Sequence, residues 1–132
     1  MSVATFAWTI VYVDDVARST AFYGAAFGFT VRLTHPEGQY AELDTGATVL
    51  AFTGHALAGS NVPGGYTRHD PVGPPLAVEL AFTTDDVPAA IDAAVAAGGR
   101  LLAAPVVKPW GQTVGYVRDP DGVLIEIATP LP

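Results

Sequence analysis

Runs with the two-residue spacing of strands and runs with the spacing of helices alternate along the chain, and the same order occurs twice. Residues 6–13 are rich in aromatic and β-branched side chains, which predicts a strand. Val16, Thr20, Tyr23 and Phe27 then recur at helical spacing, and Gly28 is expected to end that helix. Further strands are predicted over residues 29–34, 39–44 and 47–53. The first half therefore predicts the order β-α-β-β-β.

The second half of the chain repeats this order. A strand is predicted over residues 76–83, and Asp86 is expected to cap a helix that has Pro88 in its first turn, where a missing N–H is harmless. Three strands are predicted to follow, over residues 101–108, 112–118 and 123–129. Asp14-Asp15-Val16 and Asp85-Asp86-Val87 open the two helices 71 residues apart, which indicates a tandem repeat.

The repeat predicts an α+β fold built from two tandem βαβββ modules. The first module spans residues 1–54 and the second spans residues 76–132. Residues 55–75 are rich in Gly and Pro and are expected to form a linker or a lid loop, so that the chain is one domain. Apolar side chains of both modules are expected in the core: Val11, Phe22, Phe27, Leu80, Phe82, Ile91, Ile125 and Ile127.

Composition excludes several classes of protein. The 132 residues carry a net charge of −7 and their six basic residues are scattered, which argues against a nucleic-acid partner. There is no Cys, so disulfide and thiolate chemistry are absent. The apolar runs have the length of strands, and the N-terminus lacks the features of a signal peptide, so neither a membrane span nor export is expected. A cytoplasmic location is the simplest expectation.

The two modules, the turn Asp119-Pro120-Asp121-Gly122 and the terminal strand Leu124-Ile125-Glu126-Ile127 together resemble the vicinal oxygen chelate superfamily. This family includes glyoxalase, extradiol dioxygenases, fosfomycin-resistance enzymes and bleomycin-binding resistance proteins. The resemblance implies a curved eight-stranded sheet around a cup, which is often completed across a dimer. Because both modules also present sheet edges, a homodimer is expected.

The resemblance also implies where a metal ligand would lie in each of four strands. Carried over onto this chain, these positions are Trp8, Leu50, Glu79 and Glu126. Trp8 stands where a His is usual and Leu50 cannot ligate, while two carboxylates alone are a poor protein shell for Zn, Fe or Mn. The three His residues lie in predicted turns or loops. Neither a metal nor another cofactor is therefore expected.

Strand parity and the resemblance together predict a cup with aromatic walls and two acids on its floor. Such a cup suits a flat, partly apolar ligand with a positive or hydrogen-bond-donating group. Trp110 is expected at the rim. The residues expected to contact the ligand are Trp8, Ile10, Tyr12, Leu50, Phe52, Glu79, Trp110, Gln112, Val114, Tyr116 and Glu126.

Structural roles compete with these assignments. Trp8 and Tyr12 can simply fill the cup as core residues. A carboxylate inside Val78-Glu79-Leu80 is costly without a partner, so Glu79 can also be structural and pair with backbone N–H groups, Arg118 or Arg32.

Three functional hypotheses follow. The leading one is a metal-independent small-molecule binding protein, similar to the bleomycin-resistance branch and suited to a cationic aromatic antibiotic. The alternative is a lyase, isomerase or dioxygenase-like enzyme that uses Glu79 and Glu126 as acid and base. The third is a structural or regulatory dimer whose cup is filled by its own side chains.

Overall fold

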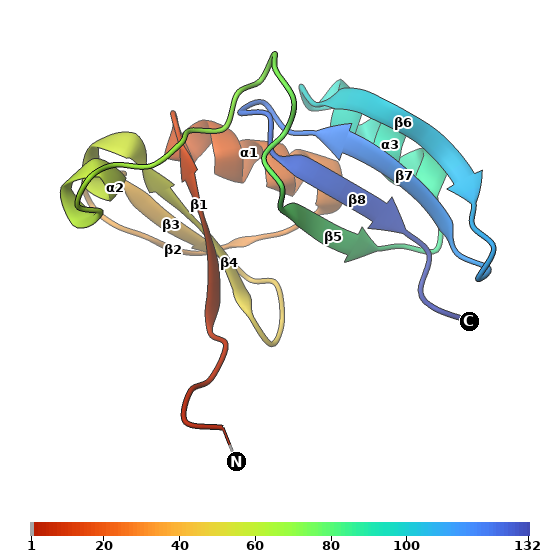
Figure 1. Cartoon of the computed structure of the whole chain (residues 1–132), viewed down its shortest axis with the longest axis horizontal. Helices are drawn as coiled ribbons and strands as arrows, with labels where there is room; N and C mark the ends of the chain where they lie inside the picture. Colours follow the sequence, from red (N-terminus) through yellow and green to blue (C-terminus); the bar gives the residue numbers. More distant parts are fainter. Residues whose placement is uncertain (1) are drawn as a thin grey trace. The chain divides into compact units, whose positions relative to one another are not determined.

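The computed structural model describes residues 2–132, which form two compact units (Figure 1). Unit 1 comprises residues 2–24 and 29–68, and unit 2 comprises Ala25–Gly28 and His69–Pro132. Each unit contains a βαβββ module, so the predicted α+β fold and its tandem repeat are confirmed. The strands form two four-stranded sheets, one in each unit, and not one continuous sheet.

Unit 1 contains β1 (Trp8–Val13), α1 (Val16–Phe27) as far as Gly24, β2 (Val31–Thr34), β3 (Tyr40–Leu43) and β4 (Val49–Gly54). The strand order is β1-β4-β3-β2, with β1 parallel to β4. Asp15 begins α1 as predicted, since its carboxylate accepts a hydrogen bond of 3.0 Å from the backbone N–H of Arg18. Helix α1 covers one face of the sheet, where the ring of Tyr23 lies 5.1 Å from that of Phe52.

A short helix follows β4 directly. Helix α2 (His55–Asn61) occupies the start of the segment in which only irregular structure was predicted, so that prediction is wrong for these seven residues. Their apolar positions are too few to give a helical periodicity in the sequence, and Gly59 lies within the helix. Helix α2 packs on β1 and β4.

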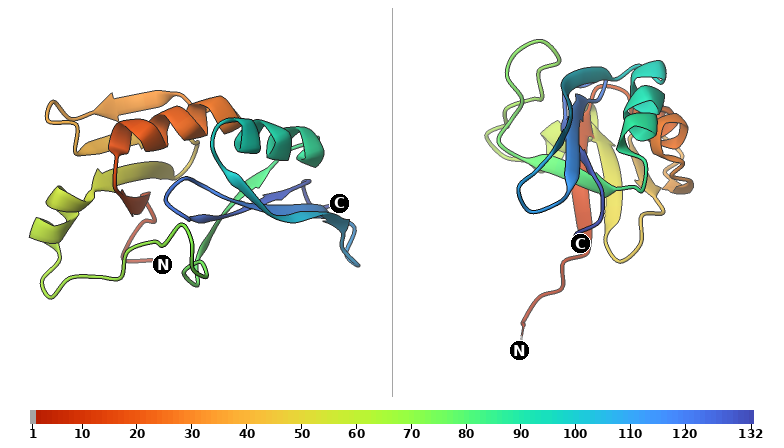
Figure 2. Two further views of the ribbon diagram at one scale, coloured as in Figure 1. Left: turned by 90° about the horizontal axis from the view of Figure 1, so that it is seen from above. Right: turned by 90° about the vertical axis from the view of Figure 1, so that its right-hand side faces the viewer.

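Unit 2 contains β5 (Glu79–Thr83), α3 (Val87–Ala96), β6 (Arg100–Val107), β7 (Thr113–Arg118) and β8 (Leu124–Ala128). The strand order is β5-β8-β7-β6, and α3 lies along one face of this sheet (Figure 2). Asp86 caps α3 as predicted and accepts a hydrogen bond from the N–H of Ala89. The predicted turn between β7 and β8 is closed by a 2.9 Å hydrogen bond from Gly122 N to Asp119 O.

The core of each unit lies between its sheet and the helix on it. Five of the eight predicted core residues are buried, namely Val11, Phe22, Ile91, Ile125 and Ile127. The other three, Phe27, Leu80 and Phe82, are half-buried, and the rings of Phe27 and Phe82 lie 5.0 Å apart. Within residues 2–132, no helix has the length and apolar character needed to cross a membrane.

Candidate functional site

The face of the unit 1 sheet opposite α1 carries a cavity. Residues paired across a sheet point to the same side, so the strand register defines this face. Tyr12 of β1 pairs with Thr53 of β4, and Thr53 pairs with Tyr40 of β3. One row of side chains, Tyr12, Thr53 and Tyr40, therefore crosses three strands on this face.

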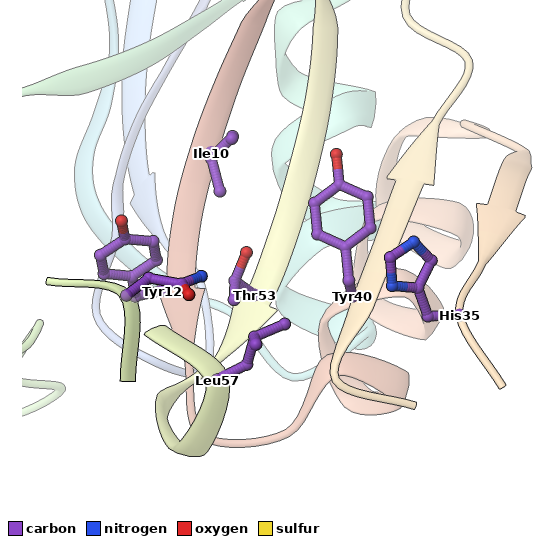
Figure 3. A pocket seen from close by; sticks show the side chains of 7 residues that line it. Ile10, Tyr12, His35, Tyr40, Thr53 and Leu57 are labelled. Atoms are coloured by element: carbon purple, nitrogen blue, oxygen red, sulfur yellow. The ribbon is translucent and has the colours of Figure 1, made fainter. Parts of the chain in front are cut away.

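These side chains enclose a cavity of about 270 Å³. Helix α2 contributes Leu57 and Asn61, and His35 comes from the turn between β2 and β3 (Figure 3). The lining combines aromatic rings and aliphatic groups with a few hydrogen-bonding groups: Ile10, Tyr12, His35, Tyr40, Thr53, Leu57 and Asn61. Ile10 and Tyr12 were predicted to contact a ligand, and the structure places both in this lining.

A buried carboxylate stabilises the neighbouring part of the same face. Glu42 is 6% exposed, and its Oε2 accepts hydrogen bonds from Tyr40 Oη (2.7 Å) and Trp8 Nε1 (3.0 Å). Arg32 Nε lies 3.4 Å from Glu42 Oε1 and compensates the charge. Burial and the hydrogen bond to Glu42 raise the pKa of Tyr40 to about 12. Tyr40 therefore stays protonated at neutral pH and donates a hydrogen bond to Glu42.

Trp8 belongs to this carboxylate cluster and not to the cavity. Its side chain is 53% exposed, so it does not fill a core, but its indole N–H is committed to Glu42. Both Glu42 and Tyr40 were missed in the sequence. The alternation within the strand at 39–44 places Tyr40 and Glu42 on one face, and that pattern could have identified them.

Leu50 and Phe52 do not lie on the cavity face, contrary to the prediction. Trp8 pairs with Val49 and Ile10 pairs with Ala51, so the alternate residues Leu50 and Phe52 point toward α1. Both are buried, and Phe52 packs on Tyr23. The position equivalent to Glu126 is Ala51, since Ile10 pairs with Ala51 as Ala81 pairs with Glu126.

The predicted acids lie together on one face of the unit 2 sheet. Ala81 of β5 and Tyr116 of β7 both pair with Glu126, and Tyr116 Oη donates to Glu126 Oε1 at 3.0 Å. Glu79 shares a hydrogen bond with Glu126. Partial burial of the Glu79 carboxyl group, the Glu126 charge and this hydrogen bond raise the pKa of Glu79. The pKa of Tyr116 is also raised, first by its hydrogen bond to Glu126.

A shallow hollow of about 300 Å³ borders Glu79, lined also by Ala77, Val78 and Leu124. The expected pairing of Glu79 with Arg118 or Arg32 is not formed, because both arginines have other partners. Arg118 donates to the backbone carbonyls of Gly122, Asp70 and Gly73, while Arg32 pairs with Glu42.

The remaining predicted residues of unit 2 lie on β7 or just before it. Val114 shares the face of Tyr116 but is buried. Trp110 is exposed, and its Nε1 donates to Gln112 Oε1 at 2.7 Å. Gln112 in turn donates from Nε2 to Thr129 O, which fixes its amide.

The residues do not fit a resident divalent metal. Trp8 uses its only polar atom as a donor to Glu42, and Ala51 has no ligand atom. Of the four positions implied for metal ligands, only the two in unit 2, Glu79 and Glu126, carry a carboxylate. Among residues 2–132 no group of three or more His, Cys, Asp or Glu side chains is arranged to hold a metal. Zn, Fe and Mn sites are normally built from imidazole or at least three protein ligands.

The fold is that of a recognised class of protein. Residues 5–127 match the model of the Glyoxalase/Bleomycin resistance protein/Dioxygenase superfamily, and the chain belongs to this family. It is 30% identical over 126 residues to a probable lactoylglutathione lyase of Vibrio parahaemolyticus, covering 90% of this chain and 86% of that protein.

Solved structures agree with this assignment. A glyoxalase-related enzyme from Fulvimarina pelagi superposes with a TM-score of 0.81 at 28% identity, covering 96% of this chain and 88% of that one. A glyoxalase/bleomycin resistance protein/dioxygenase family enzyme from Burkholderia phytofirmans PsJN has a TM-score of 0.74 at 24% identity, with 97% and 100% covered. The second likeness shows the fold alone.

Proposed function

We propose that the protein binds a small planar organic molecule in the unit 1 cavity without the help of a metal. The observation that carries the proposal is the cavity itself. It is walled by Tyr12 and Tyr40 and lies close to the lower limit of roughly 300–1,000 Å³ that is usual for ligand pockets. A face filled by its own side chains, as a purely structural role requires, would leave no such space.

The Tyr40 oxygen in the cavity favours a ligand that donates a hydrogen bond. The Tyr40 proton is committed to Glu42, so the remaining lone pair of its oxygen can only accept. Thr53 and Asn61 add side-chain oxygens that can also accept. A flat ring with an amino or amide N–H matches this lining.

The carboxyl pair of unit 2 is proposed as a second, separate place at which a cationic ligand binds. Glu79 and Glu126 face each other, and a cation in the hollow beside Glu79 would relieve their repulsion. We therefore keep these acids as proposed ligand contacts. Four further residues remain proposed ligand contacts because they are exposed or half-buried: Trp8, Trp110, Gln112 and Tyr116. The absence of nucleic-acid and membrane partners, the homodimer and the cytoplasmic location also remain predictions.

Calorimetric titration of EDTA-treated protein with a panel of planar amines and their neutral analogues tests the proposal. Leu57→Trp should fill the cavity and weaken every hit by more than about tenfold, because no space remains for a ring. Val95→Trp is the matched control, since Val95 is exposed on α3 in unit 2. If folded Leu57→Trp binds like wild type, or if binding requires added metal, the proposal is wrong.

An enzyme is the second candidate. The raised pKa of Glu79 beside Glu126 is the arrangement in which one carboxyl group donates a proton and the other accepts one. The relative named as a probable lactoylglutathione lyase adds support. Formation of lactoylglutathione by EDTA-treated protein, lost in Glu79→Gln and Glu126→Gln, would favour this candidate over simple binding.

A further inference from the structure

One imidazole joins the three chain segments at the α2 end of the unit 1 cavity. His55, the first residue of α2, has its Nε2 3.2 Å from Asp14 Oδ1, just after β1. Its Nδ1 lies 2.6 Å from Tyr66 Oη, in the segment that follows α2. The His55 side chain is 10% exposed, so these contacts are largely shielded from water.

The contact with Tyr66 continues to the cavity wall. The His55 and Tyr66 rings are stacked with their centroids 5.7 Å apart. The Tyr66 ring in turn lies 4.8 Å from the Tyr12 ring, at an interplanar angle of 57°. Tyr12 lines the cavity, as do Leu57 and Asn61 from the helix that His55 begins. His55 therefore contacts both parts of this wall, through Tyr66 and through α2.

The partners of His55 determine how its protons are arranged. A carboxylate only accepts hydrogen bonds, so Asp14 selects the tautomer with hydrogen on Nε2. Nδ1 is then the acceptor, and the Tyr66 hydroxyl donates to it. Asp14 is 65% exposed and also lies 3.9 Å from Arg68 Nη1, so its contacts with His55 and Arg68 contribute little. The shielded hydrogen bond to Tyr66 is therefore the contact through which His55 contributes most to the local structure.

We propose that His55 is a positioning residue for the cavity: by holding Tyr66 against Tyr12 and by fixing the start of α2, it sets the affinity of the cavity for a planar ligand. This rests on the proposed function of the cavity. His55 touches no ligand itself.

Two amide substitutions separate the two nitrogen contacts of the imidazole. Asn places its carboxamide oxygen near the position of Nδ1 and can accept from Tyr66, whereas Gln places its amide nitrogen near Nε2 and can only restore the contact with Asp14. His55→Asn should therefore behave like wild type. His55→Gln should behave like Tyr66→Phe, and the double variant should be no worse than either single variant, as residues acting through one bond require.

Binding of 4-aminoquinoline, a planar amine, is the first measurement. His55→Gln and Tyr66→Phe should each weaken it about 3- to 10-fold, the range of one shielded neutral hydrogen bond, with His55→Asn and Asp14→Asn within about twofold of wild type. Thermal melting of each variant confirms that it is folded. Equal affinities of His55→Asn and His55→Gln, or additive losses in the double variant, overturn the proposal.

Hydrogen exchange of the ligand-free protein is the second measurement. Backbone amides of α2 should exchange about 3- to 10-fold faster in His55→Gln and Tyr66→Phe but not in His55→Asn, because exchange reports local opening. If wild type does not bind 4-aminoquinoline, planar amines are rejected as the ligand of the cavity. The exchange rates of α2 then still test whether His55 positions this helix. Unchanged exchange in folded His55→Gln overturns the positioning role.

Discussion

Replacement of Phe52 by Ala tests which face of the unit 1 sheet is core and which is cavity. The Phe52 side chain is fully buried and packs on Tyr23 at 5.1 Å beneath α1. Removing a buried Phe loses its transfer free energy of roughly 1.5–3 kcal/mol. The space it leaves in a rigid core raises the usual total to about 3–5 kcal/mol. We therefore expect Phe52→Ala to lower the free energy of unfolding by this amount.

Ile10→Ala is the control on the opposite face. Ile10 is 45% exposed in the cavity lining, so about half of its transfer free energy is lost, or roughly 1 kcal/mol. Equilibrium unfolding in urea gives both values, and an unchanged dependence on urea shows that the unfolding reaction is the same. A loss below about 1 kcal/mol for Phe52→Ala, or a larger loss for Ile10→Ala, would refute the strand register that separates cavity from core.

Three further predictions concern unit 2 and the assembly. Gly122→Ala should lower the free energy of unfolding in urea by about 1–3 kcal/mol, because Gly122 has φ 93° and an added Cβ would collide with the carbonyl of Asp70. An unchanged midpoint of the urea transition would contradict this. The raised pKa of Glu79 means that folding favours its protonated form, so the stabilisation by this group is lost as the pH rises above the ordinary pKa of Glu. Glu79→Gln should therefore have a higher melting temperature than wild type at pH 7.5 but not at pH 4. The reverse order would contradict the contact of Glu79 with Glu126. Light scattering should give twice the 13.6 kDa chain mass, since β6 is an edge strand with exposed apolar side chains, and a monomer at micromolar concentration would count against the homodimer.

The order of helices and strands could be predicted because it depends on local chemistry. Asp15 and Asp86 each accept a hydrogen bond from the first turn of their helix, and Gly28 adopts φ 77°, which few other residues tolerate. These requirements are met by residues close together in the sequence. The pattern therefore carried enough information without knowledge of the tertiary contacts.

Counting residues from the preceding glycine could not predict which side chains of β4 point to the cavity and which to the core. Leu50 and Glu126 both lie four residues after a Gly, but Val49 pairs with Trp8 as Leu124 pairs with Glu79. The turn before β4 is thus one residue longer than the turn before β8. A one-residue shift moves every side chain to the other face, so Leu50 and Phe52 were assigned to the cavity when they belong to the core.

The α2 end of the cavity depends on contacts that leave no pattern in the sequence. His55 meets Tyr66 eleven residues later and Asp14 forty-one residues earlier. The intervening segment is rich in Gly and Pro and shows no apolar periodicity. Only packing of α2 on β1 and β4 brings these polar side chains together.

The two modules put different chemistry at equivalent positions of their sheets, and this difference explains why a metal does not fit. The register makes Trp8 equivalent to Glu79 and Glu42 equivalent to Tyr116. In unit 1 the acid is Glu42 on β3, which is buried and whose charge is compensated by Arg32. It accepts a hydrogen bond from the indole of Trp8, the residue at the position implied for a metal ligand.

In unit 2 the two acids lie on β5 and β8 and share a hydrogen bond, and Tyr116 donates a further hydrogen bond to Glu126. The negative charge of unit 1 is thus satisfied internally, which leaves its cavity neutral and aromatic. The carboxyl pair of unit 2 can still take up a proton or a cation. Each unit thus offers its own kind of surface, a neutral aromatic cavity in unit 1 and an acidic face in unit 2.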